Sequence, residues 1–144
     1  MSRDTATGSV LEQMVLPALR LGGYSYALQV DVGPRLGHGR HIVDAVAEKG
    51  SDRFLISVKW QQTGGTAEQK VPFEVMCLAE TMRAGGYARA YLVLGGEGWK
   101  LRQFYTSGGL ANHLTAAALV DIVTLESFIA RANQGTLSRT LWNP

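Results

Sequence analysis

The stretch that decides the fold is residues 40–74, which read RHIVDAVAEKGSDRFLISVKWQQTGGTAEQKVPFE. Residues 41–47 and 54–60 have the apolar, β-branched composition of two strands, and the short glycine-containing segment between them is typical of a hairpin turn. Each strand carries one charged residue in its middle or second half, Asp44 and Lys59. A charge inside a core strand is costly unless it is paired or binds a metal, so both residues require a functional explanation.

Hydrophobic periodicity on either side of this stretch predicts alternating helices and strands. Ser9 and Glu12 form a capping box for the first helix, in which Pro17 predicts a bend. The helix after the hairpin begins either after Thr66 or at Pro72. The predicted helices are residues 9–21, a helix ending at 84, a short one from about 100, 110–119 and 124–133, and the predicted strands are 24–32, 41–47, 54–60, 88–94 and 120–123.

Composition and length indicate one globular domain. The predicted order of helices and strands favours an α/β domain with a central mixed sheet of about four or five strands and helices on both faces. The chain has 144 residues, of which 46% are hydrophobic and 18% charged. The net charge is only +2, so any surface that binds nucleic acid must be local. Cys77 is the only cysteine, which excludes an internal disulfide and a cysteine-based zinc cluster. Without a signal-like or membrane-spanning segment, the expected location is cytoplasmic, with no membrane partner.

Strand alternation predicts that Ser57, Lys59 and Gln61 share one face of their strand. Lys59 can then face Asp44 across the hairpin. Phosphodiester hydrolysis needs a metal to polarise the scissile phosphate and positive charge against the developing anion. Asp44 would ligate Mg²⁺, and Lys59 would orient the attacking water and support the charged transition state.

A magnesium site usually takes one or two carboxylates, and Ser57 is a weak ligand where a second acid would be easiest to place. The chain runs about four residues past Lys59 at roughly 3.3 Å each and returns along a helix at roughly 1.5 Å per residue, so it comes level with Lys59 near Glu74. Glu74 lies at one margin of the predicted sheet-facing stripe of that helix. Glu68 lies at the other margin and is the second choice.

These residues resemble the motif of the PD-(D/E)XK nuclease superfamily, which implies a restriction-endonuclease-like core over about residues 9–95 with a C-terminal extension over 96–144. In this resemblance Asp44 matches the first metal-binding acid and Lys59 the motif lysine. Glu12 matches the acid that many members place on the first helix. On a regular helix, Glu12 lies on the same side as the inward-facing residues Val15, Leu16 and Leu19.

The chain departs from the pattern at Ser57, where the superfamily has Asp or Glu, and at Val43, where it has Pro. A branch of type II restriction endonucleases looks similar, with Ser-X-Lys on the strand and the acid relocated to the next helix, and Glu74 fits that pattern by position. The segment Lys59-Trp60-Gln61 looks like short restriction-type and phage-type members, which adds Gln61 to the candidate catalytic residues. The resemblance implies a DNA endonuclease that uses Mg²⁺, with Mn²⁺ as a substitute.

Basic residues in a glycine-rich loop could contact the DNA backbone, together with Lys70 on the following helix. They are Arg35, His38, Arg40 and His41. The alternative is a polar hairpin loop without such a role. A nuclease of this size that cuts both strands is expected to act as a homodimer, and Trp99 is assigned to packing or to the dimer surface.

Structural interpretations of the same residues remain open. Asp44 and Lys59 can form a cross-strand ion pair, Glu12 can serve only as a capping residue, and acids such as Glu68 and Glu74 are favoured near any helix N-terminus. Two functional rivals follow: a structure-selective or RNA-directed nuclease, and an inactive nuclease fold that only binds nucleic acid, which Ser57 permits.

Overall fold

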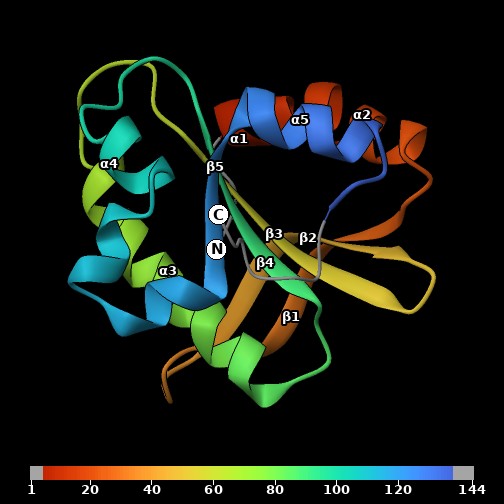
Figure 1. Ribbon diagram of the computed structural model, residues 1–144, viewed down its shortest axis with the longest axis horizontal. Helices are drawn as coiled ribbons and strands as arrows, with labels where there is room; N and C mark the ends of the chain where they lie inside the picture. The colour runs from red at the N-terminus through yellow and green to blue at the C-terminus, as the bar shows by residue number, and fades with distance from the viewer. Residues whose placement is uncertain (1–4, 138–144) are drawn as a thin grey trace.

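The computed structural model describes residues 5–137 as a five-stranded mixed sheet in the order β1-β2-β3-β4-β5 (Figure 1). The first three strands form an antiparallel meander, and the last two run parallel to β3. The strands are β1 (Ser25–Pro34), β2 (Arg40–Lys49), β3 (Asp52–Trp60), β4 (Arg89–Gly95) and β5 (Val120–Thr124). This architecture confirms the predicted α/β class and the restriction-endonuclease-like core, including the hairpin between β2 and β3.

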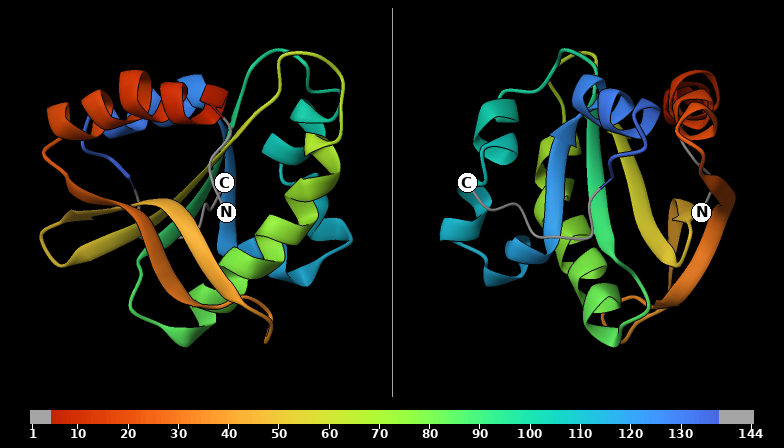
Figure 2. Two further views of the ribbon diagram at one scale, coloured as in Figure 1. Left: turned by 180° about the vertical axis from the view of Figure 1, so that it is seen from behind. Right: turned by 45° about the vertical axis from the view of Figure 1, so that its right-hand side comes forward.

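Helices cover both faces of the sheet (Figures 1 and 2). Those on one face are α1 (Thr5–Val10), the π-helical turn η1 (Leu11–Val15), α2 (Leu16–Leu21) and α5 (Leu125–Asn133). Those on the other are α3 (Ala67–Ala84), α4 (Arg102–Thr106) and the 3-10 turns η2 (Gly109–Asn112) and η3 (Thr115–Leu119). We call the apolar side chains beneath the first group the α5 layer and those beneath the second group the α3 layer. Within residues 5–137, no helix has the length and apolarity needed to cross a bilayer.

The N-terminal helix begins earlier than predicted, so Ser9 lies inside it and does not form a capping box. The predicted bend at Pro17 takes the form of a π turn just before it, in which the Leu16 N–H donates to the Leu11 carbonyl. Proline has no N–H to offer the preceding turn, and a wider turn accommodates that loss.

Helix α3 begins at Ala67, and Pro72 lies within it rather than at its start. The Gln61 side chain caps this helix, because its Oε1 accepts the Ala67 N–H at 3.0 Å, whereas Thr66 makes no side-chain cap. Pro72 cannot donate to the Glu68 carbonyl four residues earlier. The Tyr105 hydroxyl of α4 donates to that carbonyl instead, at 2.7 Å, and replaces the hydrogen bond that Pro72 cannot make.

Beyond α3, the strand predicted at 88–94 and the strand and helix predicted after 120 are confirmed, and Thr124 caps α5 by accepting the Ser127 N–H at 3.1 Å. The helix predicted over 110–119 is instead the two 3-10 turns η2 and η3, since Leu114 between them is extended.

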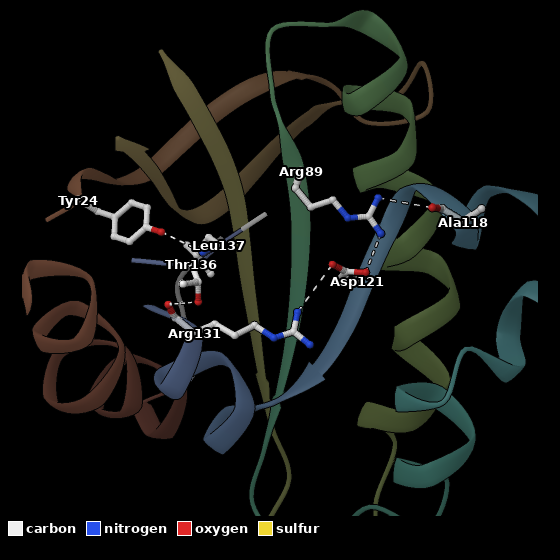
Figure 3. Close-up of polar contacts among 7 residues, drawn as sticks. All are labelled: Tyr24, Arg89, Ala118, Asp121, Arg131, Thr136 and Leu137. Atoms are coloured by element: carbon white, nitrogen blue, oxygen red, sulfur yellow. Dashed lines mark hydrogen bonds and ion pairs between the residues drawn. The ribbon is translucent and has the colours of Figure 1, made fainter. Parts of the chain in front are cut away.

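Charged residues at the β4–β5 edge of the sheet serve the fold (Figure 3). Asp121 on β5 receives the Arg89 guanidinium of β4 at 2.6 Å and that of Arg131 on α5 at 4.0 Å. On the far side of α5, the Leu137 N–H donates to the Tyr24 hydroxyl at 3.0 Å. These contacts fasten α5 and the chain after it to the sheet, and none of these five residues belongs to the predicted site.

Candidate active site

The sheet forks where β2 leaves β3. Ladder pairing between these strands ends at Ala45 and Ile56, whereas β3 stays paired with β4 as far as Trp60. At the fork, the Asp44 carboxylate takes the place of the lost ladder partner: its Oδ2 accepts the Val58 N–H at 2.7 Å. Asp44 therefore lies where the strands separate, with its carboxylate held by β3.

The ribbon of β1 and β2 changes faces at this same place. Ala45 and Ala47 point into the α5 layer, but Val43 points into the α3 layer. Strand alternation would put all three on one face, so the strand rotates at Asp44. In β1, Gln29 lies between Leu28, the partner of Ala45, and Val30, the partner of Val43, and has a φ of 50°, a left-handed conformation that is uncommon outside glycine.

The rotation turns the tip of the ribbon, the loop of residues 35–39 between β1 and β2, toward α3 (Figure 2, left). Val30 and Val32, beyond Gln29, pack against the α3 layer, whereas Tyr26 before it packs against the α5 layer. Glu80 of α3 accepts the N–H of Leu36 in the tip at 2.7 Å. The ribbon thus closes over the helix that carries the predicted second acid.

Glu74 of α3 meets both strands of the fork. Its Oε2 accepts a hydrogen bond from the Ser57 hydroxyl of β3 at 2.8 Å and lies 3.2 Å from Nε2 of His41 on β2. The Glu74 side chain is 13% exposed and that of His41 only 4%. The structure therefore brings Glu74 to the strand position that lacks an acid, Ser57, as predicted from chain geometry.

The surroundings of Glu74 keep its carboxylate charged. Burial alone would raise its pKa, but the hydrogen bond from His41, the charge of Lys59 and the Ser57 hydroxyl outweigh burial, so the pKa of Glu74 lies below its ordinary value of 4.5. Lys59, two residues after Ser57 on the same strand face, thus influences this carboxylate electrostatically. The predicted alternation of β3 is confirmed, because the α5 layer contains Phe54, Ile56, Val58 and Trp60, whereas Leu55 lies in the α3 layer.

Glu68, the second choice for the relocated acid, does not join this cluster. Its Oε1 accepts the Leu101 N–H at 2.7 Å, and its Oε2 accepts the Lys100 N–H at 3.0 Å. It is 8% exposed and holds the loop after β4. These backbone bonds occupy both of its oxygens, so Glu74 is the acid that the structure places beside Ser57.

We expect Glu68→Gln to lower the thermal stability at neutral pH, because its amide NH₂ would face a backbone donor. The Lys100 N–H is the main cause that holds the pKa of Glu68 below its ordinary 4.5; burial opposes it, and the Leu101 N–H, Gln61 and the Lys100 charge assist. A lowered folded-state pKa stabilises the protein above the unfolded-state pKa, and this contribution disappears as the pH falls through the folded-state pKa. The Tm difference between wild type and variant should therefore shrink below about pH 4.5. A difference that stays constant down to pH 3 would contradict this account; exposed Glu97→Gln is the control.

Gln61 is also committed to the loops beside the site. Besides capping α3, it donates from Nε2 to the Gly98 carbonyl at 2.8 Å. Gly96 packs against it so closely that a Cβ there would lie 2.4 Å from the Gln61 carbonyl oxygen. The position of Gln61 indicates a role in shaping the ends of β3 and β4, which lie next to Lys59.

Glu12, which the resemblance placed on an inward helical line, is exposed to solvent. The line assumed a regular helix, in which Glu12 stacks with Val15 and Leu16. The π turn from Leu11 to Val15 holds an extra residue and rotates Glu12 away from the buried side.

The basic residues divide into two groups. His38, Arg40 and Lys70 are exposed and Arg35 is half-buried, but His41, expected with them on the DNA-facing loop, is 3% exposed and lies in β2. The expected position of His41 on an exposed loop is therefore wrong, and the sequence pattern did not predict its contact with Glu74 at the candidate site. The apolar alternation of His41 with Val43 was the available signal. Arg40 pairs with Asp31 at 2.9 Å.

Of the two roles predicted for Trp99, packing and dimer surface, the structure shows packing. It is 7% exposed and donates from Nε1 to the Gly95 carbonyl at 2.7 Å. It cannot offer a dimer surface from this position.

The carboxylates of the fork suit a hard divalent cation. Within the part of the chain that the structure describes, no group of three or more His, Cys, Asp or Glu could hold a metal ion. Mg²⁺, however, is commonly held by one or two carboxylates together with water and substrate phosphate oxygens. His41 and Ser57 both contact Oε2 of Glu74, so Oε1 could serve as a ligand atom, and Asp44 carries a further carboxylate at the fork.

Comparison with known proteins identifies the family of the chain. A family model for the PD-(D/E)XK nuclease superfamily domain matches residues 3–136, whereas no curated protein matches the chain. A solved structure titled "Crystal Structure of Protein of Unknown Function AF1548" is similar at 14% identity with a TM-score of 0.48, over 76% of this chain and 54% of that one. The chain thus spans about half the length of that protein. The family match, which extends from the first helix to the end of α5, shows that the chain belongs to the PD-(D/E)XK nuclease superfamily.

Proposed function

We propose that this nuclease-superfamily domain is a Mg²⁺-dependent endonuclease that hydrolyses DNA phosphodiester bonds, of the restriction or phage type. One observation carries the proposal: Glu74 is hydrogen-bonded to Ser57, the residue that stands two positions before Lys59 where the superfamily motif has its acid. This contact puts the Glu74 carboxylate beside the strand position of the motif acid, which supports its assignment as the relocated acid.

In this proposal, Asp44, Glu74 and Lys59 have different roles in hydrolysis. Asp44 and Glu74 would hold Mg²⁺, which when bound polarises the scissile phosphate and lowers the pKa of a coordinated water. Lys59 orients the attacking water and places a positive charge beside the phosphate as negative charge builds up on it. Val58 fixes the Asp44 carboxylate through its backbone N–H, and Ser57 fixes Glu74.

The substrate proposal rests on exposed positive charge near the ribbon tip. Arg35, His38 and Arg40 lie on or next to the loop between β1 and β2, and Lys70 is exposed on α3 four residues before Glu74. Contacts from these residues would hold a phosphate backbone without reading its sequence. Cutting of both strands by a homodimer, the use of Mn²⁺ in place of Mg²⁺ and a cytoplasmic location belong to the same proposal.

The direct test compares wild type with Glu74→Gln on supercoiled plasmid DNA. Wild type is expected to nick and linearise the plasmid with Mg²⁺ and to be inactive in EDTA. Glu74→Gln keeps the size of the side chain but loses the anionic ligand, and since the stabilisation of charge by a metal is worth several kcal/mol, the rate should fall by about 10²-fold or more. Glu68→Gln, assayed below its melting temperature, should retain cleavage because Glu68 serves the loop.

A Glu74→Gln variant as active as wild type would contradict the proposal. The second candidate function is a nucleic-acid-binding module, favoured by Ser57 and by the lack of a three-residue metal cluster in the described residues. It predicts wild-type protein that binds DNA but cuts neither duplex, junction nor RNA substrates with Mg²⁺ or Mn²⁺. Cleavage of RNA or junctions alone would identify the structure-selective or RNA-directed rival.

A further inference from the structure

We infer that His41 is a positioning residue for the metal site: it holds the Glu74 carboxylate so that the oxygen it leaves unused can bind the metal. The inference rests on the proposed function and extends it to a residue outside the superfamily motif, on a different strand from Lys59.

The contact is direct and nearly dry. Nε2 of His41 lies 3.2 Å from Oε2 of Glu74, and the imidazole is 4% exposed. Ser57 donates to the same oxygen at 2.8 Å. Two donors from two strands converge on Oε2 and fix the rotation of the carboxylate, which a single hydroxyl would leave freer. Groups outside the coordination shell that hold a ligating carboxylate in this way commonly raise metal affinity.

The other ring nitrogen shows that this arrangement is not the best one for stability alone. Nδ1 of His41 is buried and has no hydrogen-bond partner. An unsatisfied buried polar atom costs free energy, and most such atoms in folded proteins are paired. An apolar residue, like its neighbour Val43 in the same layer, would avoid this cost. Departures of this kind from optimal packing are expected at functional sites.

The rotation of the ribbon at Asp44 is what brings His41 to Glu74. By strand alternation, His41 would share the face of Ala45 and Ala47 and point into the α5 layer, away from α3. The change of face at Asp44 and at Gln29, with its φ of 50°, reverses this direction. One irregularity therefore places Asp44 in the fork and aims His41 at the second acid.

The test measures Mn²⁺ binding to the whole protein by titration calorimetry, without DNA. His41→Leu fills similar space without a donor, and we expect it to weaken Mn²⁺ binding by about 10- to 100-fold. His41→Gln keeps a donor near the position of Nε2 and should recover most of the affinity. Thr81→Val, a buried change on α3 away from Glu74, is the matched control for packing and should bind Mn²⁺ as wild type does. Circular dichroism and melting curves establish that each variant is folded at the assay temperature.

The outcomes separate this inference from the proposed function. If wild type binds Mn²⁺ and cuts DNA while His41→Leu binds Mn²⁺ equally well, the inference is wrong and the nuclease assignment stands. If His41→Gln is as weak as His41→Leu, the histidine acts through packing and the inference is also wrong. Wild type that neither binds Mn²⁺ nor cuts DNA would overturn the proposed function and this inference with it.

Discussion

Lys59→Ala is expected to lower the rate of Mg²⁺-dependent DNA cleavage by about 10³-fold, because one residue both orients the attacking water and stabilises the transition-state charge. DNA binding should change little, since the exposed basic residues near the ribbon tip supply most phosphate contacts in our proposal. Under single-turnover conditions, the loss should appear in the cleavage rate rather than in the DNA concentration that gives half-maximal rate.

Two further variants decide how specific this effect is. Lys100→Ala removes an exposed lysine of the same charge and should cut at the wild-type rate. Lys59→Arg keeps the charge but not the compact ammonium, and should remain well below wild type. Equal losses in Lys59→Ala and Lys100→Ala would mean that Lys59 contributes only general positive charge. A Lys59→Ala variant that cuts at the wild-type rate would refute its proposed role.

The largest loss of stability is expected from Phe54→Ala, at about 3–5 kcal/mol in the free energy of unfolding. Phe54 is 1% exposed on β3, with ring centroids 6.0 Å from Tyr24 and 6.3 Å from Tyr91. The three rings pack in the α5 layer, from the residue before β1 across β3 to β4, so removing the middle one leaves a cavity between Tyr24 and Tyr91. Urea denaturation measured by circular dichroism gives the difference directly.

The control for this loss is Phe73→Ala. Phe73 is 49% exposed on α3, so its truncation should change the free energy of unfolding by no more than about 0.5 kcal/mol. A similar cost for both variants would mean that burial does not set the difference. If Phe54→Ala costs less than about 1 kcal/mol, the α5 layer packs more loosely than its contacts indicate.

The sequence alone was sufficient for the features that depend on short-range chemistry. The alternation of residues 54–60 predicted the face of β3 that carries Ser57 and Lys59, because side-chain direction in a paired strand has a period of two. The reach from Lys59 to Glu74 followed from the rise per residue of strands and helices. The hairpin and the sheet-flanking helices followed from turn chemistry and periodicity.

Other expectations failed where a local rule met a tertiary constraint. Glu12 was placed inward by a helical line that the π turn before Pro17 breaks. His41 was grouped with the basic residues of the glycine-rich loop, and the rotation of the ribbon that buries it against Glu74 cannot be read from strand alternation. Glu68 was a reasonable second acid by position, but the backbone of the loop after β4 occupies its carboxylate.

The sequence by itself therefore determined the layered α/β fold, the strand face of Lys59 and the helix that brings an acid to Ser57, since each depends on the geometry of one element and its neighbour. Only the tertiary structure placed Glu74, and not Glu68, beside Ser57, brought His41 to Glu74 and set Asp44 in the fork. Those outcomes depend on where β2 leaves β3 and on how the ribbon turns at Gln29 and Asp44. That rotation accompanies the packing of the ribbon against α3. A contact between segments so far apart in the chain leaves no periodic pattern in the sequence.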